Sequence, residues 1–324
     1  MAAHIFSHFS SGTILKQDTN YIAYALKTED GEGIASVYPV LPGIEVIELD
    51  LHTSSFLPLI HGTNDILEIN HCQEGRIECQ MKDGCLQYVG EGDLFLNTLH
   101  NHSCHIALPL RNYRGMVISI DCMIAGESLA ERLPEIPLNI PDLIKRFFAE
   151  DECFLIQANE HMKHLFSGMY TVSQEAKKAY FQLKVLELLI YLHYFDPHKE
   201  KQKHVFARQQ VDIVKQIQKR MTTELSYRFT IEELAREYCI SATALKSNFK
   251  GVYGTSIAAY MKNYRIKQAT SLLRDTDMGI GEIAFAMGYE SQSKFGAAFK
   301  DITKMTPMEY RKYSVMKVTL PIDS

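Results

Sequence analysis

The chain has 324 residues, of which 46% are hydrophobic and 23% charged, and its formal net charge is −5. This composition is typical of a globular protein, so it excludes a wholly disordered chain, and at roughly 150 residues per domain it favours two domains. No apolar run approaches the roughly 18 to 20 residues that a membrane span needs. The N-terminus lacks a basic segment followed by an apolar core, and the seven cysteines form no CxxC pair, so we expect a cytoplasmic protein with reduced thiols.

Charge is divided unevenly along the chain. Residues 208–313 hold 17 Lys and Arg against 11 Asp and Glu, whereas residues 1–207 hold 16 against 27. A basic C-terminal part suggests a polyanion as the partner of that part alone, while chance surface composition is the alternative.

Residues 20–122 have the pattern of β-strands. Short apolar stretches such as Ile44–Leu49 and Met116–Ile120 are separated by turn signals such as Pro42-Gly43 and Asp83-Gly84. Many short strands at regular spacing predict a sandwich or a barrel. Residues 123–141 contain three prolines and are expected to form a connecting loop.

From Pro141 to Phe195 the pattern turns helical. Apolar residues recur there at steps of three and four, which predicts one apolar helix face: Phe181, Val185, Leu188, Leu189, Leu192 and Phe195. This face either packs on the strands or forms a dimer seam, and the two interpretations are compatible. Residues 196–207 are polar and begin with a helix stop, so we expect them to form a linker. The chain is then predicted to divide into a domain over residues 1–195, this linker, a domain over residues 208–313 and a tail over residues 314–324.

The C-terminal region repeats itself with an offset of 49 residues that becomes 50 after one insertion. Ile231, Leu234 and Ala235 of the first copy correspond to Ile280, Ile283 and Ala284 of the second. After a turn, Leu245, Phe249, Lys250, Ser256 and Tyr260 correspond to Phe295, Phe299, Lys300, Thr306 and Tyr310. Two copies are too few for a solenoid, so the region is predicted to hold a pair of similar helical modules.

Each copy follows the local pattern of a helix-turn-helix. A short helix, Ile231–Tyr238 or Ile280–Met287, leads through a turn into a second helix. Thr230 is suited to cap the first of these short helices, and Glu233 lies three residues later, as a capping box requires. Gly288 suits a left-handed turn. Because the second helix of a helix-turn-helix enters the DNA major groove, two such modules in a basic region indicate DNA binding, with a generic helical bundle as the alternative.

The segment between the modules is predicted to be one long helix. Ser256 to Leu273 gives 18 residues, or about 27 Å at ~1.5 Å per residue. Such a spacer can set two recognition helices in successive major grooves, about 34 Å apart. A spacing short of a full turn requires the DNA to bend, which makes DNA flexibility part of the specificity.

Two stretches carry a resemblance to a known family. They are Arg265–Asp277, with the sequence RIKQATSLLRDTD, and Ile283–Arg311, which includes GYESQSKF. Both are similar to the conserved motifs of the AraC/XylS family of transcription regulators, and the match covers roughly the last 100 residues. The chain departs from the family pattern at Cys239 and at Lys304, where glycine is usual. A left-handed conformation at Lys304 would cost on the order of 1 kcal/mol.

Each recognition helix offers a polar face opposite its apolar one. The candidates for base contacts, at positions where the resemblance also places them, are Thr243, Lys246, Ser247, Gln292, Ser293, Lys294 and Ala297. Glutamine can pair with adenine and lysine can donate to guanine. Lys250, Lys300 and Arg311 are candidates for phosphate contacts, which position a protein without encoding sequence. For any one of these residues a solvated surface position is the alternative.

The N-terminal part resembles a cupin-type barrel in its glycine-rich hairpins, at Gly75, Glu78, Gly84, Tyr88 and Gly90–Leu94. The resemblance implies a sensor domain followed by dimerisation helices, and a small barrel can hold one small ligand in its mouth. The candidate effector site consists of polar or aromatic side chains on the strands, namely His61, Glu68, Arg76, Tyr88 and Tyr113.

Catalysis and metal binding are not expected, although histidines are abundant. His52, His61, His71, His100, His102 and His105 are of the type that binds zinc, iron or copper. However, His100-Asn101-His102 lacks the glutamate that follows this motif in enzymatic cupins. No Ser/His/Asp or Cys/His spacing marks a nucleophile, and no phosphate-binding loop is present. We therefore predict no catalytic residue, no metal ligand and no cofactor.

The sequence as a whole predicts an α+β protein, in which a cupin-like β-barrel with dimerisation helices precedes an all-α domain of two helix-turn-helix units joined by a long helix. The resemblance implies a ligand-responsive transcription activator that binds double-stranded DNA as a homodimer and contacts RNA polymerase. Two alternatives stay open. One is a metal-dependent cupin enzyme or metal sensor fused to a DNA-binding domain, and the other is a constitutive DNA-binding protein whose barrel only dimerises.

Overall fold

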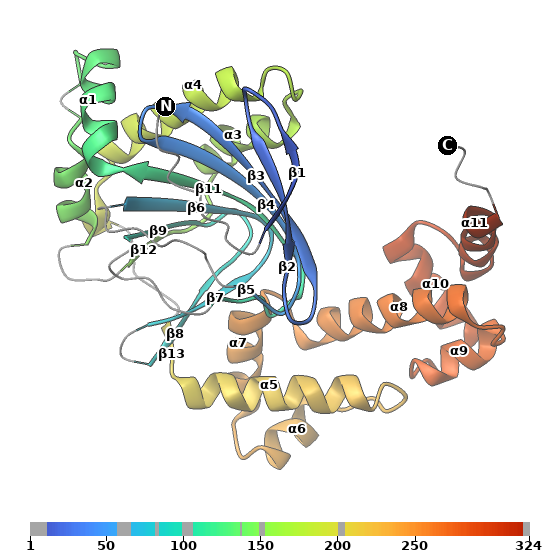
Figure 1. The fold of residues 1–324 in the computed structure, drawn as a ribbon. Helices are drawn as coiled ribbons and strands as arrows, with labels where there is room; N and C mark the ends of the chain where they lie inside the picture. The colour runs from blue at the N-terminus through green and yellow to red at the C-terminus, as the bar shows by residue number, and fades with distance from the viewer. Residues whose placement is uncertain are drawn as a thin grey trace. The chain divides into compact units, whose positions relative to one another are not determined.

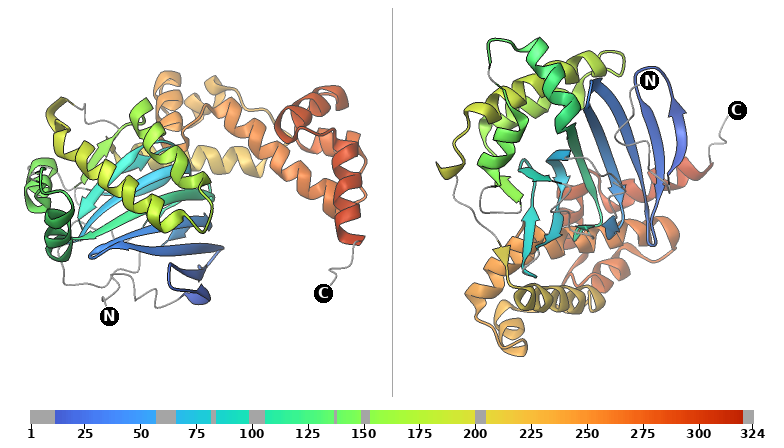
Figure 2. Two further views of the ribbon diagram at one scale, coloured as in Figure 1. Left: turned by 90° about the horizontal axis from the view of Figure 1, so that it is seen from above. Right: turned by 60° about the vertical axis from the view of Figure 1, so that its left-hand side comes forward.

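The structure is a computed structural model that describes residues 12–56, 66–81, 84–98, 106–136, 138–148, 153–199 and 205–319. The chain divides into two compact units (Figures 1 and 2), Met1–Ala207 (unit 1) and Arg208–Ser324 (unit 2). Part of the segment predicted as a linker, residues 196–207, is ordered within unit 1, since it contains the 3-10 helix η2 (Pro197–Lys199) and the strand β13 (Val205–Phe206), which pairs with β8.

Unit 1 consists mostly of strands, as the spacing of its apolar stretches predicts. With β13 they are β1 (Thr13–Gln17), β2 (Ile22–Lys27), β3 (Glu32–Leu41), β4 (Ile44–His52), β5 (Ser55–Phe56), β6 (Ile66–Gly75), β7 (Ile77–Gln80), β8 (Leu86–Val89), β9 (Leu94–Thr98), β10 (Ile106–Ala107), β11 (Tyr113–Asp121) and β12 (Cys153–Ile156). An 8-stranded sheet has the order β1-β2-β3-β4-β11-β6-β9-β12, and a 5-stranded sheet has the order β13-β8-β7-β10-β5. The α+β class is confirmed at this level, whereas the described strands lie in two sheets and closure into a cupin-like barrel stays a prediction.

In the described part of unit 1, four α-helices accompany the strands. They are α1 (Cys122–Arg132), α2 (Ile140–Phe147), α3 (Glu160–Thr171) and α4 (Lys177–Tyr194). Alternation along the strands separates two apolar layers. Val46 and Ile118 point to the side of the larger sheet that α3 and α4 cover (Figure 2). Ile47 and Val117 point to the other side of this sheet, and they form a second core together with Ile77 of the smaller sheet.

Residues 123–141 are not the loop that their prolines predicted, because α1 occupies most of the segment. Asp121 caps this helix, since its carboxylate accepts two backbone N–H groups at 3.1 and 3.0 Å. Ala125 and Leu129 bury its inner face. Pro141 falls in the first turn of α2, where a missing N–H breaks no helical hydrogen bond.

The apolar face predicted on residues 181–195 is the inner face of α4. Five of its residues are 0% exposed and join the core of the larger sheet: Phe181, Val185, Leu188, Leu189 and Leu192. The face therefore packs on the strands and is closed to a dimer partner. The outer side of α4 carries an outer stripe of Leu183, Ile190 and Tyr194 that the exposed Glu187 interrupts, and in it Leu183 is 67% and Tyr194 is 71% exposed.

Unit 2 is helical throughout its described part, as predicted. Its helices are α5 (Arg208–Thr223), α6 (Ile231–Glu237), α7 (Ala242–Tyr253), α8 (Ile257–Asp275), α9 (Ile280–Ala286), α10 (Gln292–Thr303) and α11 (Pro307–Thr319). The predicted spacer helix is α8, which has 19 residues and is capped by Ser256. Over the residues that the structure describes, no helix is long and apolar enough to cross a membrane.

The internal repeat is confirmed at the level of packing. In the first module the ring of Tyr260 meets that of Phe249 edge-on, with 5.4 Å between centroids and 79° between planes. In the second module Tyr310 meets Phe299 in the same way, at 5.5 Å and 77°. The residues that correspond in sequence thus occupy equivalent positions in two modules of the same element order, α6–α7 and α9–α10.

The departures from the family pattern occur at left-handed backbone positions, as expected for sites where glycine is usual. Cys239 in the turn of the first module has φ 53°, and its counterpart Gly288 has φ 71°. Lys304 at the end of α10 has φ 64°, and its counterpart Gly254 has φ 75°. The predicted capping box at Thr230 is also present.

Candidate nucleic-acid interface

The two recognition helices are fixed by their N-caps and their apolar faces. The Ser241 hydroxyl accepts the Ala244 N–H at 3.1 Å at the start of α7, and the Ser291 hydroxyl accepts the Lys294 N–H at 3.2 Å at the start of α10. Leu245 and Phe249 in α7, like Phe295 and Phe299 in α10, are 0% exposed. Because each helix is anchored by this face, its opposite face points to solvent.

The predicted base-contacting residues all lie on these solvent faces. Thr243, Lys246 and Ser247 are exposed on α7, and Gln292, Ser293, Lys294 and Ala297 are exposed on α10. Lys250 and Lys300, predicted to contact phosphates, are exposed further along each helix. The structure therefore brings each set together on one helix face, while the contacts with DNA stay predictions.

Lys294 already has an anionic neighbour in the free protein. Its ammonium group pairs with the carboxylate of Glu290, one turn earlier in the chain, and the two side chains are 67% and 71% exposed. This ion pair lowers the pKa of Glu290. Lys294 must leave Glu290, or share it, in order to reach DNA.

Arg311 is placed differently from the other predicted phosphate contacts. Its Nε donates to the Leu273 carbonyl at 3.3 Å and its Nη2 donates to the Met278 carbonyl at 2.6 Å, so it fastens the segment that leads into α9. Arg265 holds the segment before α6 in a similar way, because its guanidinium donates hydrogen bonds of 3.2 and 2.9 Å to two backbone carbonyls of that segment. Sequence reasoning missed this role, although an arginine among the apolar positions of α8 is a signal for it. The phosphate contact of Arg311 stays a prediction.

In unit 1, the predicted effector residue Glu68 belongs to a buried polar row across the larger sheet. Ser119 on β11 lies opposite Glu45 on β4 and opposite Glu68 on β6, which in turn lies opposite Asn97 on β9. All four are buried, and Asn97 donates to Glu68 at 3.1 Å. Ser119 is 0% exposed and its hydroxyl has no hydrogen-bond partner in the described part of the chain. The register places this row on the side that faces the smaller sheet.

The other effector candidates do not join this row. Tyr88 donates to Glu78 at 2.6 Å, and the Arg76 guanidinium lies 5.5 Å from the Tyr88 ring centre. Tyr113 is buried opposite Gly75, and its burial raises the pKa of its hydroxyl. His61 lies outside the described residues. The structure thus pairs Arg76 with Tyr88 and leaves Glu68 in a separate cluster.

The histidines of unit 1 have no common centre in the part that the structure describes. His100, His102 and His105 fall outside it, and within it no group of three or more His, Cys, Asp or Glu side chains is arranged to hold a metal ion. His71 is packed between β6 and α3, where its ring stacks on Phe166.

Unit 2 therefore carries two exposed polar helix faces on a basic helical frame, and this is the construction of helix-turn-helix DNA-binding proteins. Residues 234–313 match a family model described as a helix-turn-helix domain.

Similar proteins narrow the class of helix-turn-helix domain to which unit 2 is compared. The HTH-type transcriptional regulator AlkR of Acinetobacter baylyi is 31% identical over 86 residues, which are 26% of this chain and 28% of AlkR. The HTH-type transcriptional activator RhaR of Mannheimia succiniciproducens is 27% identical over 97 residues, 30% of this chain and 35% of RhaR. The solved C-terminal domain of AraT, a response regulator from Geobacillus stearothermophilus, is 29% identical and covers 31% of this chain and 84% of that one, with a TM-score of 0.30. Unit 2 is an AraC-type helix-turn-helix domain, and the chain spans about a third of the length of the two curated relatives.

Proposed function

We propose that the protein is a sequence-specific transcription regulator that reads two successive major-groove segments with α7 and α10. The observation that carries this proposal is the pair of exposed polar faces on equivalent modules joined by α8. With 19 residues, α8 spans about 28 Å at ~1.5 Å per residue. Where the length of α8 sets the separation of α7 and α10, that separation is shorter than the spacing of about 34 Å between successive grooves on one face, so the bound DNA is expected to bend.

The test is a selection of random duplexes by the full chain at fixed salt, since nonspecific binding falls steeply with salt. We expect a bipartite motif whose halves are centred about one helical turn apart. A single short motif that Gln292→Ala leaves unchanged would contradict reading by two helices.

Regulation by a small molecule in unit 1 is the second part of the proposal, supported by the buried row of Glu45, Ser119, Glu68 and Asn97. Burying polar groups between two sheets is costly unless they have partners. A ligand with hydroxyl or amino groups would supply a partner to the Ser119 hydroxyl of this row. The ligand must favour one arrangement of the protein over another in order to change DNA binding.

A thermal-shift screen with a panel of polyols and amines tests this part. A ligand present at 100 times its Kd should add about 2.7 kcal/mol to stability. Ser119→Val should abolish the shift, whereas Ser128→Ala, which changes a buried serine on α1, should keep it. A shift of equal size in both variants would place the ligand elsewhere.

The proposed assembly is a homodimer through the outer stripe of α4. The inner face of this helix is used within the unit, but Leu183 and Tyr194 are large apolar residues at 67% and 71% exposure. Leu183→Glu should convert the dimer to a monomer in sedimentation equilibrium. Met123→Glu is the matched control, because Met123 is 77% exposed on another helix of unit 1. A dimer that survives Leu183→Glu would exclude this stripe.

We further propose that the protein acts without a catalytic step and without a cofactor, and that it activates transcription through RNA polymerase. One relative is named as a transcriptional activator, which supports the sign of the effect. Purified polymerase on a promoter that carries the selected motif tests it, since transcript yield should rise with added protein. A fall in yield would indicate repression.

A further inference from the structure

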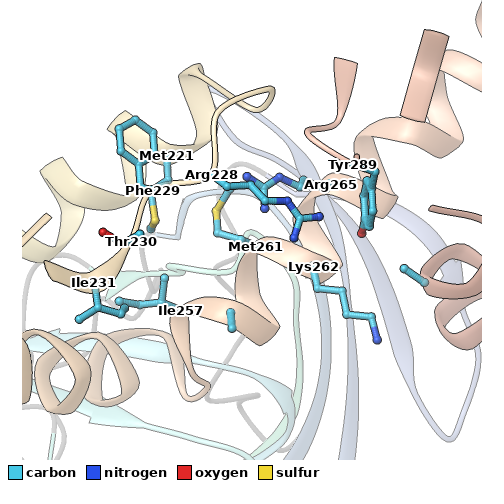
Figure 3. A pocket seen from close by; sticks show the side chains of 12 residues that line it. Met221, Arg228, Phe229, Thr230, Ile231, Ile257, Met261, Lys262, Arg265 and Tyr289 are labelled. Atoms are coloured by element: carbon cyan, nitrogen blue, oxygen red, sulfur yellow. The ribbon is translucent and has the colours of Figure 1, made fainter. Parts of the chain in front are cut away.

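A pocket of about 490 Å³ lies inside unit 2, between the two helix-turn-helix modules (Figure 3). Ile231 of the first module and Tyr289 and Ala298 of the second line it, and α8 contributes residues from Ile257 to Arg265. The volume falls within the range of roughly 300–1,000 Å³ that is usual for small-molecule sites. A molecule in this pocket would touch both modules at once.

The pocket combines an apolar lining with positive charge. Met221, Ile257 and Met261 contribute apolar surface, and the lining includes the cations of Arg228, Lys262 and Arg265 but no acidic residue. Lys262 is paired at 2.7 Å with Asp301, which lies outside the lining. Within the described residues, no carboxylate forms an ion pair with Arg228 or Arg265, and the acidic charge that acts on Arg228 from outside the lining is that of Glu290.

Both arginines are held in place by backbone carbonyls. Arg265 is 8% exposed and donates through Nε and Nη2 to the carbonyls of Leu225 and Tyr227. Arg228 donates through Nε to the Gly288 carbonyl at 2.5 Å, and its guanidinium lies 4.9 Å from the ring centre of Tyr289. A guanidinium has five N–H donors, so each arginine keeps donors for another acceptor.

The two guanidinium groups also repel each other. Burial lowers the pKa of Arg265 first, and the nearby charge of Arg228 lowers it further. Figure 3 shows the two side chains above Met261, with Tyr289 at the far end. An anion between them would relieve this repulsion and accept hydrogen bonds from donors that are already oriented.

We propose that this pocket binds a small amphipathic organic anion, with its carboxylate or phosphate on Arg228 and Arg265 and its apolar body on Met221 and Met261. A DNA phosphate fits less well, because a phosphodiester brings no apolar group to cover the methionines. The site goes beyond the proposed effector site of unit 1, since it lies in the DNA-binding unit itself. The bound anion sets how α7 and α10 are presented relative to each other.

The first experiment uses the anionic fluorophore 1-anilinonaphthalene-8-sulfonate with the full chain, and decanoate or decanol as competitor. Arg228→Gln and Lys262→Gln should each weaken probe binding at least tenfold. Lys267→Gln is the matched control, because Lys267 is exposed on α8 outside the lining, and it should bind like the wild type. Decanoate should displace the probe and decanol should not. Equal probe affinity in all four proteins, or equal displacement by decanol, would overturn the proposal.

A second pair of variants tests the pocket without changing its charge. Ala258→Trp places an indole at an exposed lining position, whereas Asn263→Trp places one at an exposed position of α8 outside the lining. Only the first should abolish probe binding, with unchanged far-ultraviolet circular dichroism in both. Binding of a random-sequence duplex is measured in parallel. Arg228→Gln that weakens duplex binding and leaves probe binding intact would identify the pocket as a phosphate contact and would overturn the proposal.

Discussion

Acidification should weaken the packing of α3 on the larger sheet through a single histidine. His71 is 5% exposed, its ring stacks on Phe166 at 3.8 Å between centroids, and its Nδ1 lies 2.8 Å from the Tyr170 hydroxyl. Burial lowers the pKa of His71 from 6.5 to about 4. The folded protein therefore keeps this side chain neutral at pH values where the unfolded chain protonates it.

The size of the effect follows from the two pKa values. Between them the unfolded chain binds more protons than the folded chain, so the free energy of unfolding falls as the pH falls. At pH 5.5 the unfolded state is about ten-elevenths protonated at His71 and the folded state is almost neutral, which costs about 1.4 kcal/mol relative to pH 7.5. The loss starts below pH 6.5 and reaches about 3 kcal/mol below pH 4.

Urea denaturation at pH 7.5 and pH 5.5, with wild type and His71→Gln, measures this contribution. Glutamine does not titrate and can still bond the Tyr170 hydroxyl. The wild type should lose about 1.4 kcal/mol more than the variant between the two pH values, and this difference removes the contribution of every other titrating group. Equal losses in both proteins would refute the assignment of the acid sensitivity to His71.

Four further substitutions test unit 2. Lys304→Gly should raise stability by about 0.5–1 kcal/mol in thermal denaturation, because removing the left-handed strain at φ 64° outweighs the larger backbone entropy that glycine loses on folding; no gain would contradict the strain. Gly288→Ala should cost about 2 kcal/mol or more, because its Cβ would lie 2.5 Å from the Leu225 carbonyl oxygen at φ +71°; a neutral result would contradict this geometry. Gln292→Ala should cost about 1–3 kcal/mol of binding free energy on the selected operator and relax specificity there. Lys300→Ala should weaken the binding of all duplexes alike and lower the slope of the salt dependence by about one. Equal losses on all sequences for both variants would exclude base reading by Gln292.

Much of unit 2 follows from sequence because its determinants are local. The capping box at Thr230, the four-residue spacing of Leu245 and Phe249 and the left-handed turn at Gly288 each act within a few residues. The internal repeat supplies a second, independent instance of the same pattern. The resemblance to the AraC/XylS family then indicates which face of α7 and of α10 is expected to contact DNA.

The errors in unit 1 concern contacts between distant segments. The apolar run of β12 lies within a region of helical periodicity, and only its pairing with β9 makes it a strand. The periodicity of α4 predicts its inner face, but it leaves open whether that face packs on the strands or on a second protomer. In unit 2, the role of Arg311 likewise depends on two carbonyls more than 30 residues away in sequence.

The ion pair at the start of α10 has a consequence for the search along DNA. Glu290 acts as a tethered counterion for Lys294, so a DNA phosphate that takes this lysine must displace Glu290, while the released salt ions come from the DNA. The net charge that nonspecific DNA meets on α10 is thus lower than a count of lysines suggests. Breaking the pair costs the same free energy on every sequence, so the predicted base contact of Lys294 discriminates only through an oriented acceptor that the right sequence offers and a wrong sequence lacks.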